Sequence, residues 1–167
     1  MSFRFECRTC GDMHEGLPSF GPDAPASYVR LEDGQKHQRA VLGSDNCIID
    51  NALFFIRARL AIPIDDHIDP FVWLVWCSLS KKAYDIWTDA FDQEKRSQIG
   101  PLAGRLNTIL PFYKNTLNLV TTVHLCDDGK RPFLEVQKAD HQLYYDQRDG
   151  LTVEETQRLV HDLLHST

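Results

Sequence analysis

The sequence has no hydrophobic run long enough to cross a membrane. Its longest apolar segment, Phe71–Leu79, is about half the ~20 residues that a transmembrane helix needs. The first residues, Met1–Glu6, contain no apolar segment of the kind that a secretory signal requires. We therefore expect a cytoplasmic protein with no membrane partner.

The chain also lacks an excess of positive charge. It carries 18 Lys and Arg against 24 Asp and Glu, which gives a net charge of −6. Affinity for nucleic acids comes mainly from contacts of Lys and Arg with phosphates, so this balance argues against a nucleic-acid partner. The sequence contains no Gly-x-Gly-x-x-Gly, Walker, Gly-x-Ser-x-Gly or His-Glu-x-x-His motif. The common nucleotide-binding, hydrolase and metalloprotease functions thus lose their usual support.

What is present is an ordinary globular composition, with 43% hydrophobic and 25% charged residues. The 167 residues show no repeat, no low-complexity tract and no clear linker, so we predict a single domain over 1–167. Residues 1–20 form a subregion, a two-cysteine knuckle and the loop after it. The Pro- and Gly-rich segment 18–26 indicates a loop that leads into a short helix through Tyr28 and Leu31.

Alternating apolar residues predict strands in the middle of the chain. From Phe54 to Ile64 the even positions are apolar, while Arg57 and Arg59 lie on the other face, which is typical of a half-buried strand. Phe71–Cys77 is apolar on both faces, which favours a central strand covered on both sides. Three further segments carry strand or turn signals: 117–125, Asp127-Asp128-Gly129-Lys130 and 132–136.

Two segments carry helical periodicity. Ser80 can cap a helix whose apolar stripe runs from Ala83 to Phe91. Thr152 and Glu155 form a capping box ahead of a closing helix. The apolar residues of that closing helix are Val153, Val160, Leu163 and Leu164. Because strands and helices do not alternate regularly, we predict an α+β fold with an antiparallel sheet of about four to six strands and helices packed on it.

The sharpest chemical feature is the knuckle Cys7-Arg8-Thr9-Cys10-Gly11. Two thiolates at this spacing can bind one tetrahedral zinc ion, and glycine suits the positive φ of such a turn. His14 is a candidate third ligand and Cys47 the most available fourth thiol, with His141 or Cys126 as substitutes. The chain has five cysteines and no second Cys-x-x-Cys. Three interpretations therefore stay open: a structural zinc site, two reduced cysteines without a ligand, and a redox pair.

Other candidate sites have plain structural explanations. His161 and His165 have the i, i+4 spacing of a helical zinc pair, but histidines near a helix C-terminus also complement the helix dipole. The acidic segment Asp65–Asp69 has no calcium-loop spacing and is typical of a solvated connection. Asp140 and His141 could act as an acid–base pair, which requires a geometry that sequence does not reveal.

Arg57 and Arg59 project from the polar face of one predicted strand. Together with Arg131 they could hold a carboxylate or a phosphate through paired hydrogen bonds. The alternative is that they pair with Glu135 or Asp50. We favour this second interpretation.

A series of short motifs runs along nearly the whole chain: Phe5–Gly11, His14–Pro18, Asp45–Asp50, Phe54–Arg57, Ile62-Pro63, Trp73–Ser80, Leu110-Pro111, Thr116–Leu119, Arg131-Pro132 and Asp140-His141. Their number and order resemble the bacterial domain of unknown function 2199 family. Ala58, Leu74 and Gln142 depart from the family pattern, where glycines or a proline are expected. The resemblance implies no established activity. It does imply that one recurring pattern includes Cys7, Cys10, His14, Cys47 and His141.

Two functions are consistent with these patterns. The first is a non-enzymatic binding or interaction protein that binds a protein partner, as an immunity protein binds a toxin, or a second copy of itself, with a structural zinc as an option. Its support is the lack of catalytic motifs, the acidic charge and the aromatic residues of the predicted sheet. The alternative is a small metal- or thiol-dependent enzyme that uses Cys7, Cys10, His14 and Cys47. We favour the first.

Overall fold

The computed structural model of the chain describes residues 4–6, 11–66 and 69–165. Within these ranges, seven strands form one sheet in the order β3-β4-β5-β6-β7-β8-β9, and β1 and β2 form a separate two-stranded sheet. The strands are β1 (Arg4–Glu6), β2 (Met13–Glu15), β3 (Ala40–Leu42), β4 (Asn46–Ile49), β5 (Leu53–Ile62), β6 (Phe71–Leu79), β7 (Leu102–Leu106), β8 (Val120–His124) and β9 (Phe133–Val136). The α+β class is confirmed, and the main sheet has one strand more than the upper end of the predicted range.

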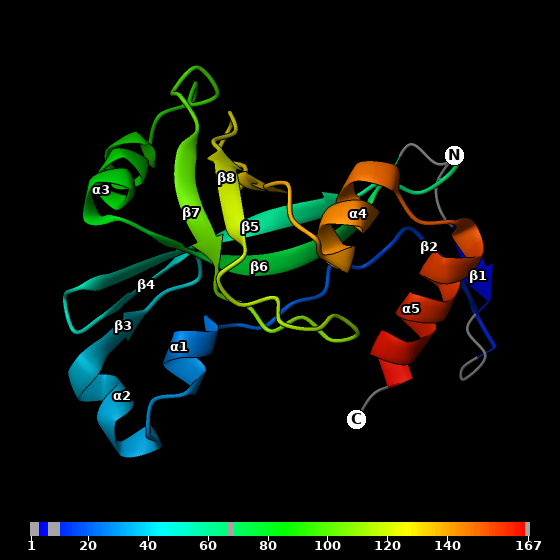
Figure 1. Cartoon of the computed structure of the whole chain (residues 1–167), viewed down its shortest axis with the longest axis horizontal. Helices are drawn as coiled ribbons and strands as arrows, with labels where there is room; N and C mark the ends of the chain where they lie inside the picture. The colour runs from blue at the N-terminus through cyan, green and yellow to red at the C-terminus, as the bar shows by residue number, and fades with distance from the viewer. Residues whose placement is uncertain (1–3, 7–10, 67–68, 166–167) are drawn as a thin grey trace.

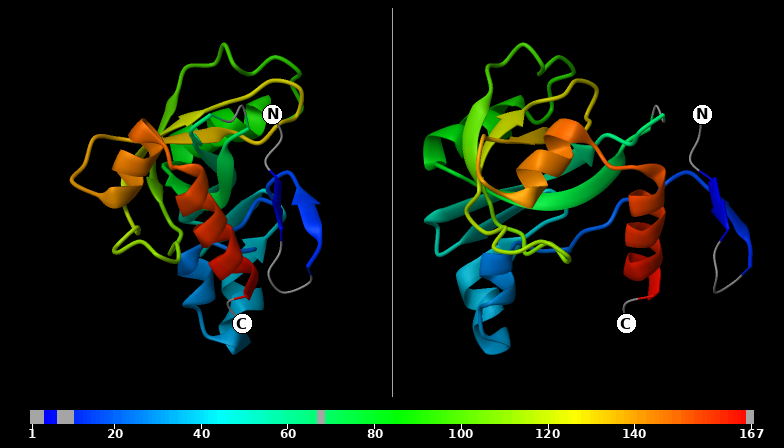
Figure 2. Two further views of the ribbon diagram at one scale, coloured as in Figure 1. Left: turned by 90° about the vertical axis from the view of Figure 1, so that its right-hand side faces the viewer. Right: turned by 45° about the vertical axis from the view of Figure 1, so that its right-hand side comes forward.

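Helices lie at both ends of this sheet. They are α1 (Ala26–Val29), α2 (Asp33–Arg39), α3 (Lys81–Ala90), α4 (Gln142–Asp149) and α5 (Val153–His165). Helices α1 to α3 lie toward one end, whereas α5 and the β1–β2 hairpin lie toward the other (Figure 1, Figure 2). α4 contacts β5 and β9. No helix in the described part of the chain combines the length and hydrophobicity that a transmembrane segment requires.

The main core is built from alternate residues of the strands. In β5 the even-numbered residues from Phe54 to Ile62 are buried, as their alternation predicted. They share one cluster with the odd-numbered residues of β6. Burial of a large aliphatic side chain contributes about 1.5–3 kcal/mol, so this cluster is the main source of stability. β7 can approach β6 closely because Gly104 has no side chain: a Cβ atom there would lie 2.3 Å from Cys77 Sγ.

A smaller cluster covers part of the opposite face of the sheet. It consists of Cys47, Ile49, Phe55 and Trp76, with Tyr28, Leu31 and Ala40 packed on it. Trp76 Nε1 donates a hydrogen bond to Pro22 O at 3.1 Å, which holds the loop before α1 against the sheet. The predicted covering of both faces of β6 is therefore confirmed at Trp76, while Val72 and Leu74 are only half-buried.

Both predicted helix starts are confirmed. Ser80 Oγ accepts a hydrogen bond from Ala83 N at 3.1 Å at the start of α3. Thr152 Oγ1 accepts one from Glu155 N at 3.1 Å, and Glu155 Oε2 accepts one from Thr152 N at 2.9 Å. These two bonds form the capping box of α5.

The buried faces of α3 and α5 are narrower than predicted. Phe91 is 44% exposed because α3 ends at Ala90, and its ring packs edge-on against Trp87 at 5.1 Å between ring centres. In α5, Val160 is buried, whereas Leu164, one turn later, is 40% exposed. The last turn of α5 extends away from the barrel (Figure 1).

A parallel contact between β5 and β9 closes the sheet. It consists of a single register pair, Arg59 opposite Phe133, with Arg59 N donating to Pro132 O at 2.8 Å. The contact joins β5 to β9, so that strands β5 to β9 form a small five-stranded barrel. The sequence predicted an antiparallel sheet without this closure, because the closing residues lie far apart in the chain and share no local pattern.

Candidate functional site

The parallel register between β5 and β9 ends at the Arg59–Phe133 pair, and α4, which contacts both strands, lies beside them (Figure 1). Gln147 Nε2 donates to Leu134 O at 2.8 Å, and Gln147 Oε1 accepts from Val136 N at 2.7 Å. In a continued parallel ladder, these two backbone groups of β9 would bond to β5. A glutamine side chain of α4 therefore replaces a strand partner.

The backbone of Ala61 in β5 faces the same opening. On β6, Val72 O and Leu74 N bond to Phe20 at 3.3 and 2.7 Å, on the side away from β5. Val72 and Leu74 therefore belong to the non-hydrogen-bonded pairs of the β5–β6 ladder. In such a pair, the residue on the partner strand also turns its N–H and C=O groups away from the ladder. Ala61 lies opposite Val72, so its N–H points toward the seam. In a continued ladder this N–H would donate to Leu134 O of β9. Leu134 O instead accepts a hydrogen bond from Gln147 Nε2 of α4.

The opened seam forms a groove of about 610 Å³, which we call the α4 groove. Strands β5, β6 and β9 form one wall and α4 forms the other. The lining residues are Arg59, Ala61, Pro70, Val72, Phe133, Leu134, Glu135, Val136, Tyr144, Gln147 and Arg148. The volume lies within the range of roughly 300–1,000 Å³ that small-molecule sites occupy.

Arg59 has no carboxylate partner among the described residues, and its buried Nε makes no hydrogen bond to any of them. Asp50 Oδ2 instead lies 2.7 Å from Arg39 Nη2. Glu135 Oε2 lies 3.3 Å from His124 Nε2. The predicted pairing of Arg59 with one of these two acids is therefore wrong.

The other two arginines of the predicted set are engaged away from the groove. Arg57 Nη2 donates to Pro22 O at 3.2 Å, and its guanidinium lies 5.8 Å from the centre of the Trp76 ring. Arg131 Nε donates to Asp45 Oδ1 at 2.7 Å. The three arginines do not form one anion site, and only Arg59 lines the α4 groove.

Helix α4 contributes a second cation, Arg148, and one aromatic ring, Tyr144, to the lining of the groove. Arg148 Nε and Nη2 donate to Asp149 Oδ1 and Oδ2, each at 2.7 Å. These bonds raise the pKa of Arg148 above its ordinary value and neutralise its charge locally. Its guanidinium lies 5.5 Å from the Tyr144 ring centre and 5.3 Å from that of Tyr145. The α4 wall is therefore aromatic and nearly neutral.

The family of uncharacterised proteins conserved in bacteria, DUF2199, matches residues 6–151. The chain belongs to this family. The match contains the barrel strands and α4, so the α4 groove lies within the family region. It also confirms the resemblance inferred from the motifs. No curated protein and no solved structure matches the chain significantly.

In this family member, the predicted zinc knuckle lies mostly outside the described residues. That applies to Cys7 and Cys10 and to the side chain of His14, so the knuckle stays a prediction. Cys47 is buried among apolar side chains of the smaller cluster, and burial raises the pKa of its thiol to about 11. Within the described ranges, no group of three or more His, Cys, Asp and Glu side chains could hold a metal ion.

His141 caps α4 rather than facing its neighbour Asp140. His141 Nδ1 accepts from Leu143 N at 3.1 Å, and Nε2 contacts Lys114 O. Asp140 Oδ1 accepts from the Tyr145 hydroxyl at 2.9 Å. The two residues of the predicted acid–base pair therefore bond to different partners.

The rings of His161 and His165 lie 4.6 Å apart in an edge-to-face arrangement on α5. Among the described residues, no His, Cys, Asp or Glu completes a group of three with these two histidines that could hold a metal ion. In the acidic connection Asp65–Asp69, residues 67–68 lie outside the described ranges.

Sequence reasoning found Arg59 but missed α4 and its groove residues. The available signals were a capping residue, His141, and a C-terminal glycine, Gly150, whose φ is 83°. The helix between them has a weakly apolar face, with Leu143 as its buried residue. That face gave no periodicity strong enough to predict a helix.

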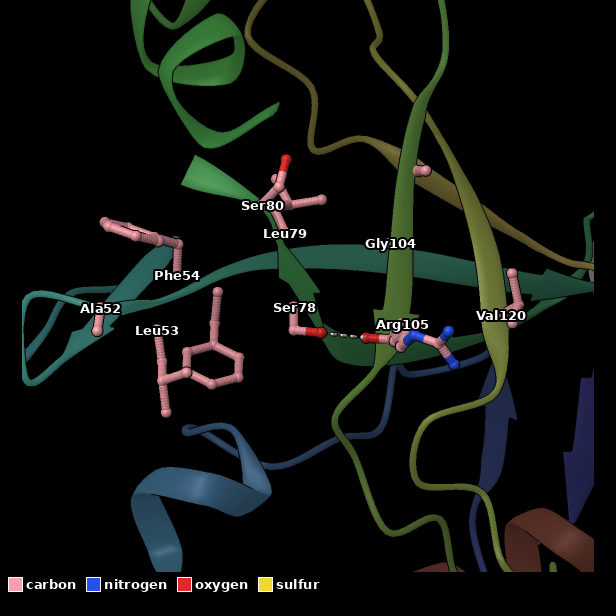
Figure 3. A pocket seen from close by; sticks show the side chains of 11 residues that line it. Ala52, Leu53, Phe54, Ser78, Leu79, Ser80, Gly104, Arg105 and Val120 are labelled. Carbon is pink, nitrogen blue, oxygen red and sulfur yellow. Dashed lines mark hydrogen bonds between the residues drawn. The ribbon is translucent and has the colours of Figure 1, made fainter. Parts of the chain in front are cut away.

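A second hollow, of about 390 Å³, lies on the outer face of the sheet near the β4–β5 turn (Figure 3). Leu53 and Val120 flank it and are 49% and 47% exposed. Inside it, Ser78 Oγ donates to Arg105 O at 3.3 Å, as Figure 3 shows. The hollow is a shallow, mainly apolar surface without a catalytic arrangement.

Proposed function

We propose that this protein is a non-enzymatic binding protein and that its ligand site is the α4 groove. The observation that carries the proposal is the opened seam, in which Gln147 ties α4 to the edge of β9 and a cavity of about 610 Å³ remains between α4 and the strands. A cavity of this size with apolar walls and few polar groups is the usual form of a small-molecule site.

A thiol-dependent enzyme gains less support. A reactive thiol needs exposure and a lowered pKa. Burial instead raises the pKa values of Cys47 and Cys77 to about 11. The notion that Cys47 acts as a nucleophile therefore conflicts with its surroundings.

Binding of a protein partner or of a second copy is the other form of the proposal. Its support is the exposed apolar pair Leu53 and Val120 at the hollow of Figure 3. Leu53→Asp should then abolish co-purification of the partner, or shift a dimer to a monomer in size-exclusion chromatography. A monomer that retains no partner would remove this form.

The ligand site can be tested with the neutral fluorescent probe Prodan. Ala61→Phe places a ring in the α4 groove and should abolish the probe's fluorescence gain. Ala103→Phe, which changes the hollow of Figure 3, is the matched control and should bind as the unmodified chain does. The proposal fails if the unmodified chain does not bind Prodan, or if Ala61→Phe binds it equally well.

A further inference from the structure

The guanidinium of Arg59 makes few hydrogen bonds within the described part of the protein. Its strongest side-chain contact is a long one, 3.9 Å from Nη2 to Cys126 Sγ. Its Nε is buried and has no hydrogen-bond acceptor among the described residues. Buried charged donors almost always have acceptors in folded proteins, so the guanidinium of Arg59 is a candidate for an acceptor that the described residues do not supply.

A second donor lies two residues further along the same strand. The N–H of Ala61 points into the seam, where the carbonyl of Leu134 has been taken by Gln147. Arg59 and Ala61 both line the α4 groove. The groove therefore offers a guanidinium and a backbone N–H, and each of them has a free donor.

The charges around the groove limit what these donors can bind. Arg148 is neutralised by its bidentate pair with Asp149. Glu135 adds a negative charge and lies 3.3 Å from His124 Nε2. Arg59 is therefore the one cation of the lining without an ion-pair partner among the described residues. This balance favours a monoanion over a doubly charged phosphate, and the planar fork of an arginine matches the two oxygens of a carboxylate.

The remaining walls are apolar. Ala61 and Val72 lie side by side on neighbouring strands, and Phe133 and Tyr144 add aromatic surface. Phe133 is 42% exposed, and its other face is stacked on His124 at 4.5 Å. A ligand that fills this groove must have an apolar body attached to its acidic group.

We infer that the α4 groove binds a small amphipathic monocarboxylate, with its carboxylate on the guanidinium of Arg59 and the N–H of Ala61 and its apolar body between Val72 and Tyr144. The inference rests on the proposed function, since it names the class of ligand that the groove receives.

The test uses three probes that share a phenyl group: 4-phenylbutyrate, its neutral amide and 2-phenylethyl phosphate. Displacement of Prodan and calorimetry measure their affinities for the full chain. We expect the carboxylate to bind about 10- to 100-fold more tightly than the amide, the range that charge-assisted hydrogen bonds give. The phosphate should bind more weakly than the carboxylate.

Arg59→Gln should remove the preference for the acid, and Arg59→Lys should restore part of it, because the lysine keeps the charge but not the fork. Arg57→Gln is the matched control on the same strand and face, and it should leave the preference unchanged. Thermal unfolding of each variant shows that it is folded, and Arg59→Lys supplies the second reading if Arg59→Gln does not fold.

The outcomes separate this inference from the proposed function. If the amide binds as tightly as the acid and Ala61→Phe abolishes both, the carboxylate inference is overturned and the ligand site stands. Tighter binding of the phosphate than of the carboxylate also overturns it. If neither the probes nor Prodan bind, both proposals fail.

Discussion

Arg59 and Phe133 are the one register pair at which β5 and β9 meet in the described structure. On one side of this pair the barrel is closed. On the other side the strands separate, and the side chain of Gln147 in α4 makes the hydrogen bonds to β9 that a strand would otherwise make. The barrel thus changes from closed to open at Arg59, the residue to which we assign the ligand.

The first prediction concerns the two hydrogen bonds from the Gln147 side chain to the backbone of β9. Gln147→Ala leaves Leu134 O and Val136 N without their partners, and each unsatisfied buried backbone group costs about 1–3 kcal/mol. We expect the free energy of unfolding to fall by about 2–4 kcal/mol in urea denaturation. Gln142→Ala, an exposed change on the same helix, is the control and should cost about 0.5 kcal/mol or less. Equal losses in the two variants would contradict the role of Gln147.

A second prediction concerns the close approach of β7 to β6. In Gly104→Ala the new Cβ would lie 2.3 Å from Cys77 Sγ and 2.9 Å from Ser78 O, so overpacking should destabilise the fold by about 1–3 kcal/mol. Gly100→Ala, where a Cβ meets nothing within 4 Å, is the control. Adding Cys77→Ala should recover part of the loss, and a double-mutant cycle with no coupling between the two sites would refute the contact.

The third prediction is a loss of stability at alkaline pH. Burial raises the pKa of the Cys47 thiol from 9.0 to about 11, so the folded chain holds a proton that the unfolded chain has released. Stability is then fully present below about pH 9 and falls as the pH rises toward about 11. A two-unit shift corresponds to about 3 kcal/mol at most. Cys47→Ala should reduce the slope of unfolding free energy against pH between these values but not abolish it, because burial also raises the pKa of the Cys77 thiol to about 11. An unchanged slope would count against the burial argument.

A fourth prediction concerns the zinc knuckle. If Cys7 and Cys10 bind zinc, untagged protein should contain about one equivalent by elemental analysis, and Cys7→Ser should lose it. Because Cys47 packs in the smaller cluster, Cys47→Ala should lower stability yet keep the metal. Loss of zinc from Cys47→Ala would instead make it the fourth ligand. Metal-free protein would leave two reduced cysteines or a redox pair.

The sequence alone determined the features that depend on neighbouring residues. The even-numbered positions of β5, the caps at Ser80 and Thr152 and the turn before β9 are all local patterns, because side-chain alternation and capping involve residues a few positions apart. The family followed from the same short motifs read in order.

Only the tertiary structure decided the α4 groove. Whether Arg59 pairs with Glu135 depends on which strand closes the barrel, and Glu135 faces His124 instead. Gln147 carries no motif, and its role exists only where α4 meets the edge of β9. Hydrogen bonds and charges between distant segments are set by packing. The sequence could therefore name Arg59 as a candidate but could not show that it would be left without a carboxylate partner among the described residues.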